Sequence, residues 1–216
     1  MIANNLIILG TGGSSLDISD VVDSLNADGE VWKTVGFLDD GKKAGSQHRG
    51  LPILGPLSAA QQYKNCAFIN SIGSDLNYKS RAVIIANCEL DKQSFSTLVH
   101  PKASVSPRAR LGVGVCVNYG VSIGGGAVVG DHVYISPGAI IGHDTVIGAY
   151  SIIAPGAIVS GFVEVGSSCY IGAGAAIRQS LSIGDCSLVG MGAVVVRNVQ
   201  SGVTVIGTPA KIYCRH

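Results

Sequence analysis

An aliphatic residue recurs at every sixth position through most of the second half of the chain. Val, Leu or Ile occupies all seventeen positions of this series from Val99 to Val195. Neither an α-helix, with a period of about 3.6 residues, nor a strand with alternating side chains has this spacing. A six-residue period is the signature of a parallel β-helix, in which each hexad forms a short strand and a corner, and three hexads close one triangular coil. The series therefore predicts a β-helix.

Two further positions in each hexad fit the interior and the corners of such a coil. Glycine follows the aliphatic residue in nine hexads, for example at Gly112 and Gly124, and we expect these positions to need backbone angles that other residues resist. A small residue often stands four positions after the aliphatic one, where the interior leaves little room. These small residues are Ala103, Ala109, Ala127, Ala139, Ser151, Ala157, Ala175, Ser187 and Ala193.

The composition changes near Val99, and the residues before it have the pattern of a separate α/β domain. Residues 5–10 predict a buried strand, Thr11 to Ser15 a turn, and apolar residues at helical spacing continue to Leu25. This strand, glycine turn and helix match the first unit of a Rossmann-like sheet. Further strands are predicted at 33–38, 67–72 and 97–99, with helices near 57–64 and 76–87. The predicted fold class is α/β plus β: a small Rossmann-like domain of four parallel strands over residues 1–98, then a left-handed parallel β-helix over 99–216.

The glycine turn of the N-terminal domain is a candidate ligand site. Gly10 and Gly12 match the first two glycines of the dinucleotide motif G-x-G-x-x-G, but Ser15 stands in place of the third, so the pattern gives little support to NAD binding. Gly13 and Ser14 precede or open the helix, where free backbone amides suit a diphosphate.

Carboxylates follow the next predicted strand. Asp39 and Asp40 come directly after residues 33–38, at the carboxyl edge of the sheet, where they can accept hydrogen bonds from sugar hydroxyls, an amine or a base N–H. An Asx-type turn is the structural alternative for this pair. Gly73 ends a further strand at the same edge, which is where open α/β sheets usually bind ligands.

The β-helix carries a histidine in an open corner. Residues eighteen apart stack on successive coils, so His143 has Gly125 one coil before it and Gly161 one coil after it. Asp144 follows directly and can hold one imidazole tautomer, as a carboxylate does for a general base. A solvated corner histidine is the alternative. His132, in another corner, is a weaker candidate, and no closely spaced pair of histidines supports a zinc site.

Composition and spacing exclude several classes of protein. Hydrophobic residues make up 47% of the chain, but Gly or a polar residue interrupts each apolar run before the roughly 18 residues that a spanning helix needs. A formal net charge of +1 without a basic run does not indicate nucleic-acid binding. We expect a cytoplasmic protein because the first residues lack the pattern of a secretory signal. Free thiols are expected for the six cysteines, which lack C-x-x-C spacing: Cys66, Cys88, Cys116, Cys169, Cys186 and Cys214.

Several features of the chain together resemble one family. They are the hexads, the His143–Asp144 corner, a GTPAK segment (207–211), a GTGG segment (10–13) and a GFLDD segment (36–40). The chain is similar to the sugar acyltransferases of the hexapeptide-repeat superfamily that include sialic acid O-acetyltransferases and the N-acetyltransferases making di-N-acetylbacillosamine. This resemblance implies a homotrimer. We expect no bound metal, because the histidines lack the spacing of a zinc site. Acetyl-CoA would lie in the cleft between neighbouring β-helices, and a UDP-linked amino sugar would bind the N-terminal domain.

The resemblance also implies a role for individual residues. His143 matches the general base of the family, and Asp144 matches the acidic residue that orients it. The positions that would bind the sugar nucleotide are Gly10, Gly12, Gly13, Ser14, Ser15, Asp39, Asp40 and Gly73. The positions that would lie near acetyl-CoA are Ile152, Gly161, Ala173, Met191 and Lys211.

We therefore predict an acetyl-CoA-dependent N-acetyltransferase that acts on the 4-amino group of a UDP-linked 4-amino-4,6-dideoxy sugar. Three alternatives remain open at this point. The first is an O-acetyltransferase that acts on the hydroxyl of a sugar such as sialic acid. The second is a trimeric sugar-nucleotide-binding protein without catalytic activity, and the third is a zinc hydratase of the γ-carbonic anhydrase type.

Overall fold

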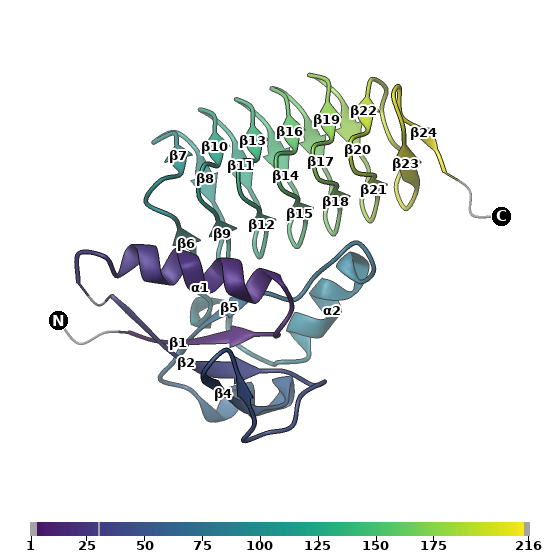
Figure 1. Cartoon of the computed structure of the whole chain (residues 1–216). Coiled ribbons are helices and arrows are strands. Elements are labelled where there is room, and N and C mark those ends of the chain that lie inside the picture. The colour runs from purple at the N-terminus through teal and green to yellow at the C-terminus, as the bar shows by residue number, and fades with distance from the viewer. Residues whose placement is uncertain (1–3, 30, 214–216) are drawn as a thin grey trace.

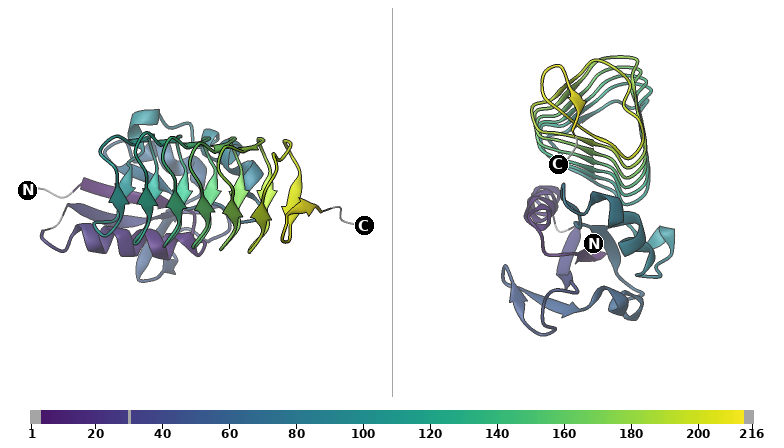
Figure 2. Two further views of the ribbon diagram at one scale, coloured as in Figure 1. Left: turned by 90° about the horizontal axis from the view of Figure 1, so that it is seen from above. Right: turned by 90° about the vertical axis from the view of Figure 1, so that its right-hand side faces the viewer.

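The structure of the protein, a computed structural model, describes residues 4–29 and 31–213 and contains both predicted parts (Figure 1). A small α/β domain lies against one side of a long β-helix, whose triangular coils are visible end-on in Figure 2. The predicted fold class is confirmed. Cys214 lies outside the described residues.

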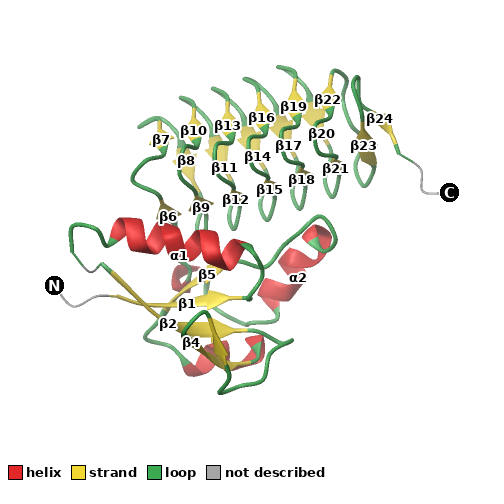
Figure 3. Cartoon of the chain, in the orientation of Figure 1, coloured by secondary structure: helices red, strands yellow, loops and turns green. Residues whose placement is uncertain are grey.

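The N-terminal domain is built on a five-stranded sheet with the strand order β3-β4-β2-β1-β5. The four strands from β4 to β5 are parallel, and β3 pairs antiparallel with β4. Its strands are β1 (Asn4–Leu9), β2 (Trp32–Leu38), β3 (Gln47–His48), β4 (Leu51–Gly55) and β5 (Ala67–Asn70). Its helices, red in Figure 3, are α1 (Ser14–Leu25) and α2 (Arg81–Ala86), with 3-10 helices η1 (Leu57–Gln62), η2 (Tyr78–Ser80) and η3 (Lys92–Ser94).

Several predicted elements of this domain differ from the structure. The strand predicted at 97–99 is β6 (Leu98–Val99), which pairs with β9 of the β-helix rather than with the N-terminal sheet. The fourth parallel strand is instead β4, which the pattern did not reveal because it is short and contains Pro52. The helix predicted at 57–64 is the 3-10 helix η1, and that predicted at 76–87 begins as a 3-10 turn and continues as α2.

Three parallel sheets form the faces of the β-helix. We call two of them the outer sheets, because the N-terminal domain packs on the third. The first outer sheet contains β7 (Ser104–Val105), β10 (Ser122–Ile123), β13 (Ile140–Ile141), β16 (Ile158–Val159), β19 (Ala176–Ile177) and β22 (Val194–Val195). The second contains β8 (Arg110–Leu111), β11 (Val128–Val129), β14 (Val146–Ile147), β17 (Glu164–Val165) and β20 (Ser182–Ile183).

The third sheet carries the N-terminal domain on its outer surface, and we refer to it as the docked sheet. It contains β6, β9 (Cys116–Val117), β12 (Tyr134–Ile135), β15 (Ile152–Ile153), β18 (Tyr170–Ile171), β21 (Leu188–Val189) and β23 (Thr204–Ile206), followed by the antiparallel β24 (Lys211–Ile212). The second residue of each β-helix strand through β22 is the aliphatic residue of the predicted series. Its side chain faces the interior, and Ala127, Ala139, Ala157, Ala175 and Ala193 fill the space between these residues with no exposed surface.

The nine glycines of the hexads serve a different purpose from the one predicted. Their φ angles lie outside the left-handed region, and each stands where the next coil comes very close. A Cβ on Gly124, for example, would lie 2.6 Å from the backbone nitrogen of His143. The left-handed φ occurs two residues later in each turn, at every sixth residue from Gly114 to Gly192. Seven of these fourteen turn positions hold residues other than glycine: His132, Asp144, Tyr150, Phe162, Ser168, Ser180 and Cys186.

Apolar packing and buried hydrogen bonds join the two domains. Tyr134 and Ile152, on the outside of the docked sheet, share one core with residues of the N-terminal domain, and the Tyr134 hydroxyl donates a hydrogen bond to Asp17 Oδ2 at 2.8 Å. The side chain of Arg81 enters the junction from α2 and is 1% exposed. Its guanidinium donates to the carbonyl oxygens of Ile72 and Tyr150, both at 2.6 Å. Burial lowers the pKa of Arg81 to about 10, so it stays charged at neutral pH.

Among the described residues, no helix is long and apolar enough to cross a bilayer.

Candidate active site

His143 and Asp144 lie in the turn between β13 and β14, which we call the His corner (residues 142–144). The Nδ1 atom of His143 lies 2.9 Å from Asp144 Oδ2, and both side chains are more than half exposed. A carboxylate that accepts the Nδ1–H hydrogen bond fixes the tautomer in which Nε2 carries the free electron pair. The pair therefore has the chemistry of a general base that accepts a proton at Nε2.

Neighbouring coils make room for this imidazole, as the sequence predicted. A Cβ on Gly161 would lie 2.7 Å from His143 Nε2, so only glycine leaves the ring its place on that side. On the other side, a Cβ on Gly125 would lie no closer than 3.4 Å to any heavy atom, the nearest being Arg108 Nε and Ser106 Oγ. Gly161, predicted to lie near the coenzyme, is thus next to the catalytic candidate.

A hollow of about 460 Å³ continues along the same corner of the β-helix. It is lined by Ser160, Arg178, Gln179 and Ser180, which belong to the next two coils. The guanidinium of Arg178 places a positive charge in this hollow, a suitable partner for a phosphate group. Gln179 stands eighteen residues after Gly161 and so continues the column of His143. The sequence pattern did not single out Arg178, because an isolated exposed arginine carries no spacing signal.

The other predicted coenzyme residues lie away from the His corner of the same chain. Ala173 and Met191 occupy the corner between the docked sheet and the first outer sheet, where Met191 is 79% exposed. Lys211 is exposed on β24. Ile152 is 5% exposed because it lies under the chain's own N-terminal domain. The proposed coenzyme contact at Ile152 is therefore wrong, since a side chain in the domain junction offers no surface to a ligand.

The glycine turn of the N-terminal domain leaves open space at its tip. A Cβ on Gly12 or Gly13 would have no heavy atom within 4 Å. Ser14 is the first residue of α1, whereas the side chain of Ser15 is fully buried and donates to the carbonyl oxygen of Gly12 at 2.7 Å. A Cβ on Gly10, which has a φ of 93°, would lie 2.6 Å from Ile72 Cγ1. Gly10 and Ser15 thus shape the turn, while Gly12, Gly13 and Ser14 are open to a ligand.

The two carboxylates expected to contact the sugar or base are engaged within the chain. Asp39 Oδ2 accepts hydrogen bonds from the backbone N–H of Thr11 at 2.8 Å and from its hydroxyl at 2.7 Å. Asp39 Oδ1 accepts from the N–H of Gly41, and Asp40 Oδ1 accepts from the N–H of Leu57, each at 2.8 Å. The bond from Gly41 to Asp39 is the Asx-type turn given as the structural alternative. The two bonds from Thr11 also make Asp39 an anchor of the glycine turn, a role that the sequence pattern did not predict.

Gly73 lies at the domain junction. Its φ is 145°, and a Cβ there would come within 2.6 Å of Ile152 Cδ1 and 2.8 Å of Arg81 Cδ. Glycine at this position lets the carboxyl edge of the sheet pack closely on the docked sheet. Sequence reasoning missed Arg81, because a single basic residue at the start of a short helix gives no sign of complete burial.

One chain does not bring the glycine turn and the His corner together. The N-terminal domain packs on the docked sheet, whereas the His corner joins the two outer sheets and is the one corner of the triangle that the docked sheet does not share (Figures 1 and 2). A site that uses both parts therefore needs a second chain.

His132 is a packing residue rather than a second base. Its ring is 5% exposed, stacks on Tyr150 with centroids 4.9 Å apart, and meets Phe95 edge-on at 4.5 Å. Burial lowers the pKa of His132 to about 4, with the charge of Arg81 acting in the same direction. No group of three or more metal-ligating side chains occurs within residues 4–29 and 31–213.

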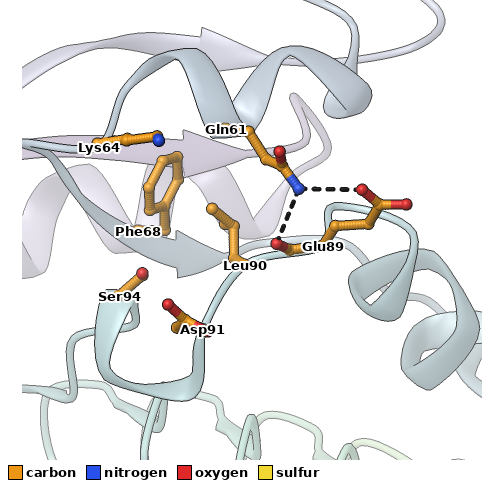
Figure 4. A pocket seen from close by; sticks show the side chains of 7 residues that line it. All are labelled: Gln61, Lys64, Phe68, Glu89, Leu90, Asp91 and Ser94. Carbon is orange, nitrogen blue, oxygen red and sulfur yellow. Dashed lines mark hydrogen bonds between the residues drawn. The ribbon is translucent and has the colours of Figure 1, made fainter.

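A separate pocket of about 360 Å³ lies on the N-terminal domain beside β5 (Figure 4). Gln61 of η1 donates hydrogen bonds to the backbone oxygen of Glu89 at 3.1 Å and to its Oε2 at 3.0 Å, and Phe68 and Leu90 form the apolar part of the wall. No residue of the predicted site lines this pocket.

Comparisons with known proteins agree with this geometry. The sequence profile described as PglD N-terminal domain matches residues 5–86, and that described as bacterial transferase hexapeptide matches residues 126–161. A comparison with curated protein sequences gave no match.

Several solved structures are similar over nearly the full chain. The acetyltransferase domain of PglB from Neisseria gonorrhoeae, solved with acetyl coenzyme A, is 29% identical with a TM-score of 0.85 over 98% of this chain and 100% of that one. A perosamine N-acetyltransferase mutant from Caulobacter crescentus, solved with CoA and GDP-perosamine, is 30% identical with a TM-score of 0.84 over 100% and 99%. WeeI from Acinetobacter baumannii is 25% identical with a TM-score of 0.82 over 98% and 100%.

The coiled hexads and these similar structures define an acyltransferase of the hexapeptide-repeat superfamily. Within that superfamily, the chain belongs to the sugar N-acetyltransferases that carry a PglD-type N-terminal domain, the family of the PglB acetyltransferase domain and of perosamine N-acetyltransferase.

Proposed function

We propose that the protein transfers the acetyl group of acetyl-CoA to the 4-amino group of a nucleotide-linked 4-amino-4,6-dideoxy sugar, with UDP as the carrier. The observation that carries this proposal is the His143–Asp144 pair, held at 2.9 Å in an open corner of the β-helix. The relatives solved with acetyl coenzyme A and with GDP-perosamine support the coenzyme and the kind of acceptor.

His143 acts as the general base in the proposed reaction. The neutral sugar amine attacks the thioester carbonyl, a C–N bond forms, and His143 Nε2 takes the proton that the amine loses. Asp144 stabilises the resulting imidazolium through Nδ1. A backbone N–H such as that of Gly161 stabilises the oxyanion. The intermediate then collapses, the C–S bond breaks, and the coenzyme leaves as a thiol that takes the proton back from His143.

We propose a homotrimer with its active sites between chains. The His corner of one chain would face the glycine turn of a neighbour, since a single chain keeps the two apart. Apolar side chains on the outer sheets support contact between copies: Ile140 is 44% exposed, and Ile158 and Val146 are each 42% exposed. Closed rotational symmetry is the usual way for identical chains to bury such surfaces.

The hollow beyond Gly161 suits the coenzyme, with the charge of Arg178 available to a phosphate group. The glycine turn suits the acceptor, because open amides at the start of α1 can bind a diphosphate. The GDP-perosamine in the Caulobacter relative makes a GDP-linked acceptor the main alternative to UDP. A panel of acceptors therefore has to include both nucleotides.

The test is a thiol-release assay with acetyl-CoA and UDP-, GDP- and dTDP-linked 4-amino sugars, with sialic acid as a hydroxyl acceptor. We expect turnover with one amino sugar nucleotide. We expect His143→Ala to lower kcat by about 10² to 10⁴, the usual contribution of a general base, without changing the oligomer measured by light scattering. Turnover with sialic acid alone would assign the protein to O-acetylation, and an unchanged rate in His143→Ala would remove the histidine from the mechanism.

A further inference from the structure

Phe162 occupies a backbone conformation that its side chain resists. Its φ is 57°, in the left-handed region that favours glycine, at one of the fourteen turn positions where the β-helix requires this angle. Glycine fills seven of those positions, and Asp, Ser or Cys fills four others. A bulky residue there costs conformational free energy, so its presence needs a compensating contact.

The other two bulky residues at these positions have such a contact within the chain. His132 and Tyr150 stack on each other at 4.9 Å in the domain junction, where the ring of His132 is 5% exposed. Phe162 has no comparable burial, because it is 57% exposed. Packing of the folded chain therefore does not account for this phenylalanine.

The ring of Phe162 instead touches the catalytic candidate. Its centroid lies 4.9 Å from that of His143, with the two planes at 89°, which is the favourable edge-to-face arrangement. The backbone places the two side by side on neighbouring coils, since the N–H of Phe162 donates to the carbonyl oxygen of His143 at 3.1 Å.

We propose that Phe162 is a positioning residue for His143. Three contacts then define the imidazole: Asp144 holds Nδ1, Gly161 leaves space beside Nε2, and Phe162 limits rotation of the ring. A side chain that is otherwise exposed keeps most of its rotamer freedom, and this freedom has to be lost each time the base meets the amine. Phe162 removes part of that cost in advance. This inference rests on the proposed role of His143 as the base.

The kinetic test compares Phe162→Gly with Phe162→Tyr. Glycine relieves the backbone strain and occurs at seven equivalent turns, so the variant is expected to fold and to assemble like the parent protein. An edge-to-face pair contributes about 0.5 to 1.5 kcal/mol, which corresponds to a fall in kcat of about 2- to 12-fold in Phe162→Gly. Both KM values should change less than twofold, and Phe162→Tyr, which keeps the ring, should restore kcat.

Two further measurements separate this inference from the proposed function. In NMR spectra of protein with labelled histidine, taken without substrate, the His143 signals should lose the ring-current shift in Phe162→Gly and keep it in Phe162→Tyr. His143→Ala assigns those signals. The double variant Phe162→Gly, His143→Ala should be no slower than His143→Ala alone, because Phe162 acts through the imidazole.

The inference is overturned if kcat and the His143 signals are unchanged in Phe162→Gly while His143→Ala is inactive. It is also overturned if the loss appears only in KM, which would make the ring a substrate contact, or if the oligomer dissociates, which would make it an interface residue. Full activity in His143→Ala would instead refute the proposed function, and the NMR comparison would still report whether Phe162 holds the ring.

Discussion

Replacing His132 by phenylalanine tests the electrostatics of the domain junction. The neutral ring is buried between Phe95 and Tyr150. Its Nδ1 atom is buried without a hydrogen-bond partner and would lie 2.7 Å from a Cβ at Gly114. Protonation would create an N–H group with no acceptor. Burial and the nearby charge of Arg81 accordingly lower the pKa of His132 from 6.5 to about 4.

The sign of the effect follows from proton binding in the two states. Between pH 6.5 and pH 4 the unfolded chain binds a proton at His132 that the folded chain does not, so the folded state loses stability as the pH falls through this window. The full effect is about 3.4 kcal/mol, and about 2 kcal/mol is already lost at pH 5. The charge of Asp131 raises the pKa of His132 and the charge of Lys92 lowers it, and the value of about 4 includes both effects.

Phenylalanine keeps an aromatic ring at this position but cannot bind a proton. The free energy of unfolding of His132→Phe should be within about 1 kcal/mol of the parent at pH 7, and the parent should lose about 2 kcal/mol relative to the variant at pH 5. Urea unfolding at matched protein concentration from pH 7 to pH 4 measures this difference. Burial also lowers the pKa of His48 and His100, but both remain in the two proteins and cancel. Parallel pH dependence in parent and variant would refute the reasoning.

Two further substitutions test the site. Gly161→Ala should lower kcat by up to about 100-fold in the thiol-release assay, because the added Cβ would lie 2.7 Å from His143 Nε2. The matched control is Gly125→Ala, whose Cβ would have no heavy atom closer than 3.4 Å. This control should keep the parent rate. Equal rates in the two alanine variants would contradict this placement. Asp39→Ala removes two hydrogen bonds from Thr11 that hold the glycine turn. It should raise KM for the nucleotide sugar at least about tenfold and leave KM for acetyl-CoA unchanged. A change in KM for acetyl-CoA instead would show that the glycine turn does not bind the acceptor.

The six-residue period predicted the β-helix well because each coil repeats the same packing problem. One aliphatic residue per strand must fill the same interior space, so the signal recurs seventeen times and local exceptions hardly weaken it. The N-terminal domain has no such repetition. Its strand β4 contains Pro52 and joins the parallel part of the sheet by pairing with the distant β2. The sequence of β6 has the pattern of any short apolar strand and does not show that its partner is β9 of the β-helix.

Within the candidate site, the sequence predicted a contact well where it is local, as between the adjacent His143 and Asp144. A contact was less predictable where two distant segments decide the outcome. Ile152 matches a coenzyme position along the chain, but the N-terminal domain covers its side chain. The spacing of residues in the sequence cannot predict that burial. Asp39 has the residue type of a sugar contact, yet Thr11 uses its carboxylate. Phe162 stood out only once its φ and its contact with His143 were known.

The buried junction between the two domains has a consequence for motion. Enzymes with two substrates often open and close by a hinge between two lobes of one chain. Here the hydrogen bonds of Arg81 and Tyr134, together with the apolar core around Ile152, fasten both lobes into one rigid body. Opening a hinge would expose that core to water. In the proposed trimer, the gap that receives the acceptor and the coenzyme can therefore widen or narrow only by small shifts of whole chains against one another, or by movement of the side chains that line it.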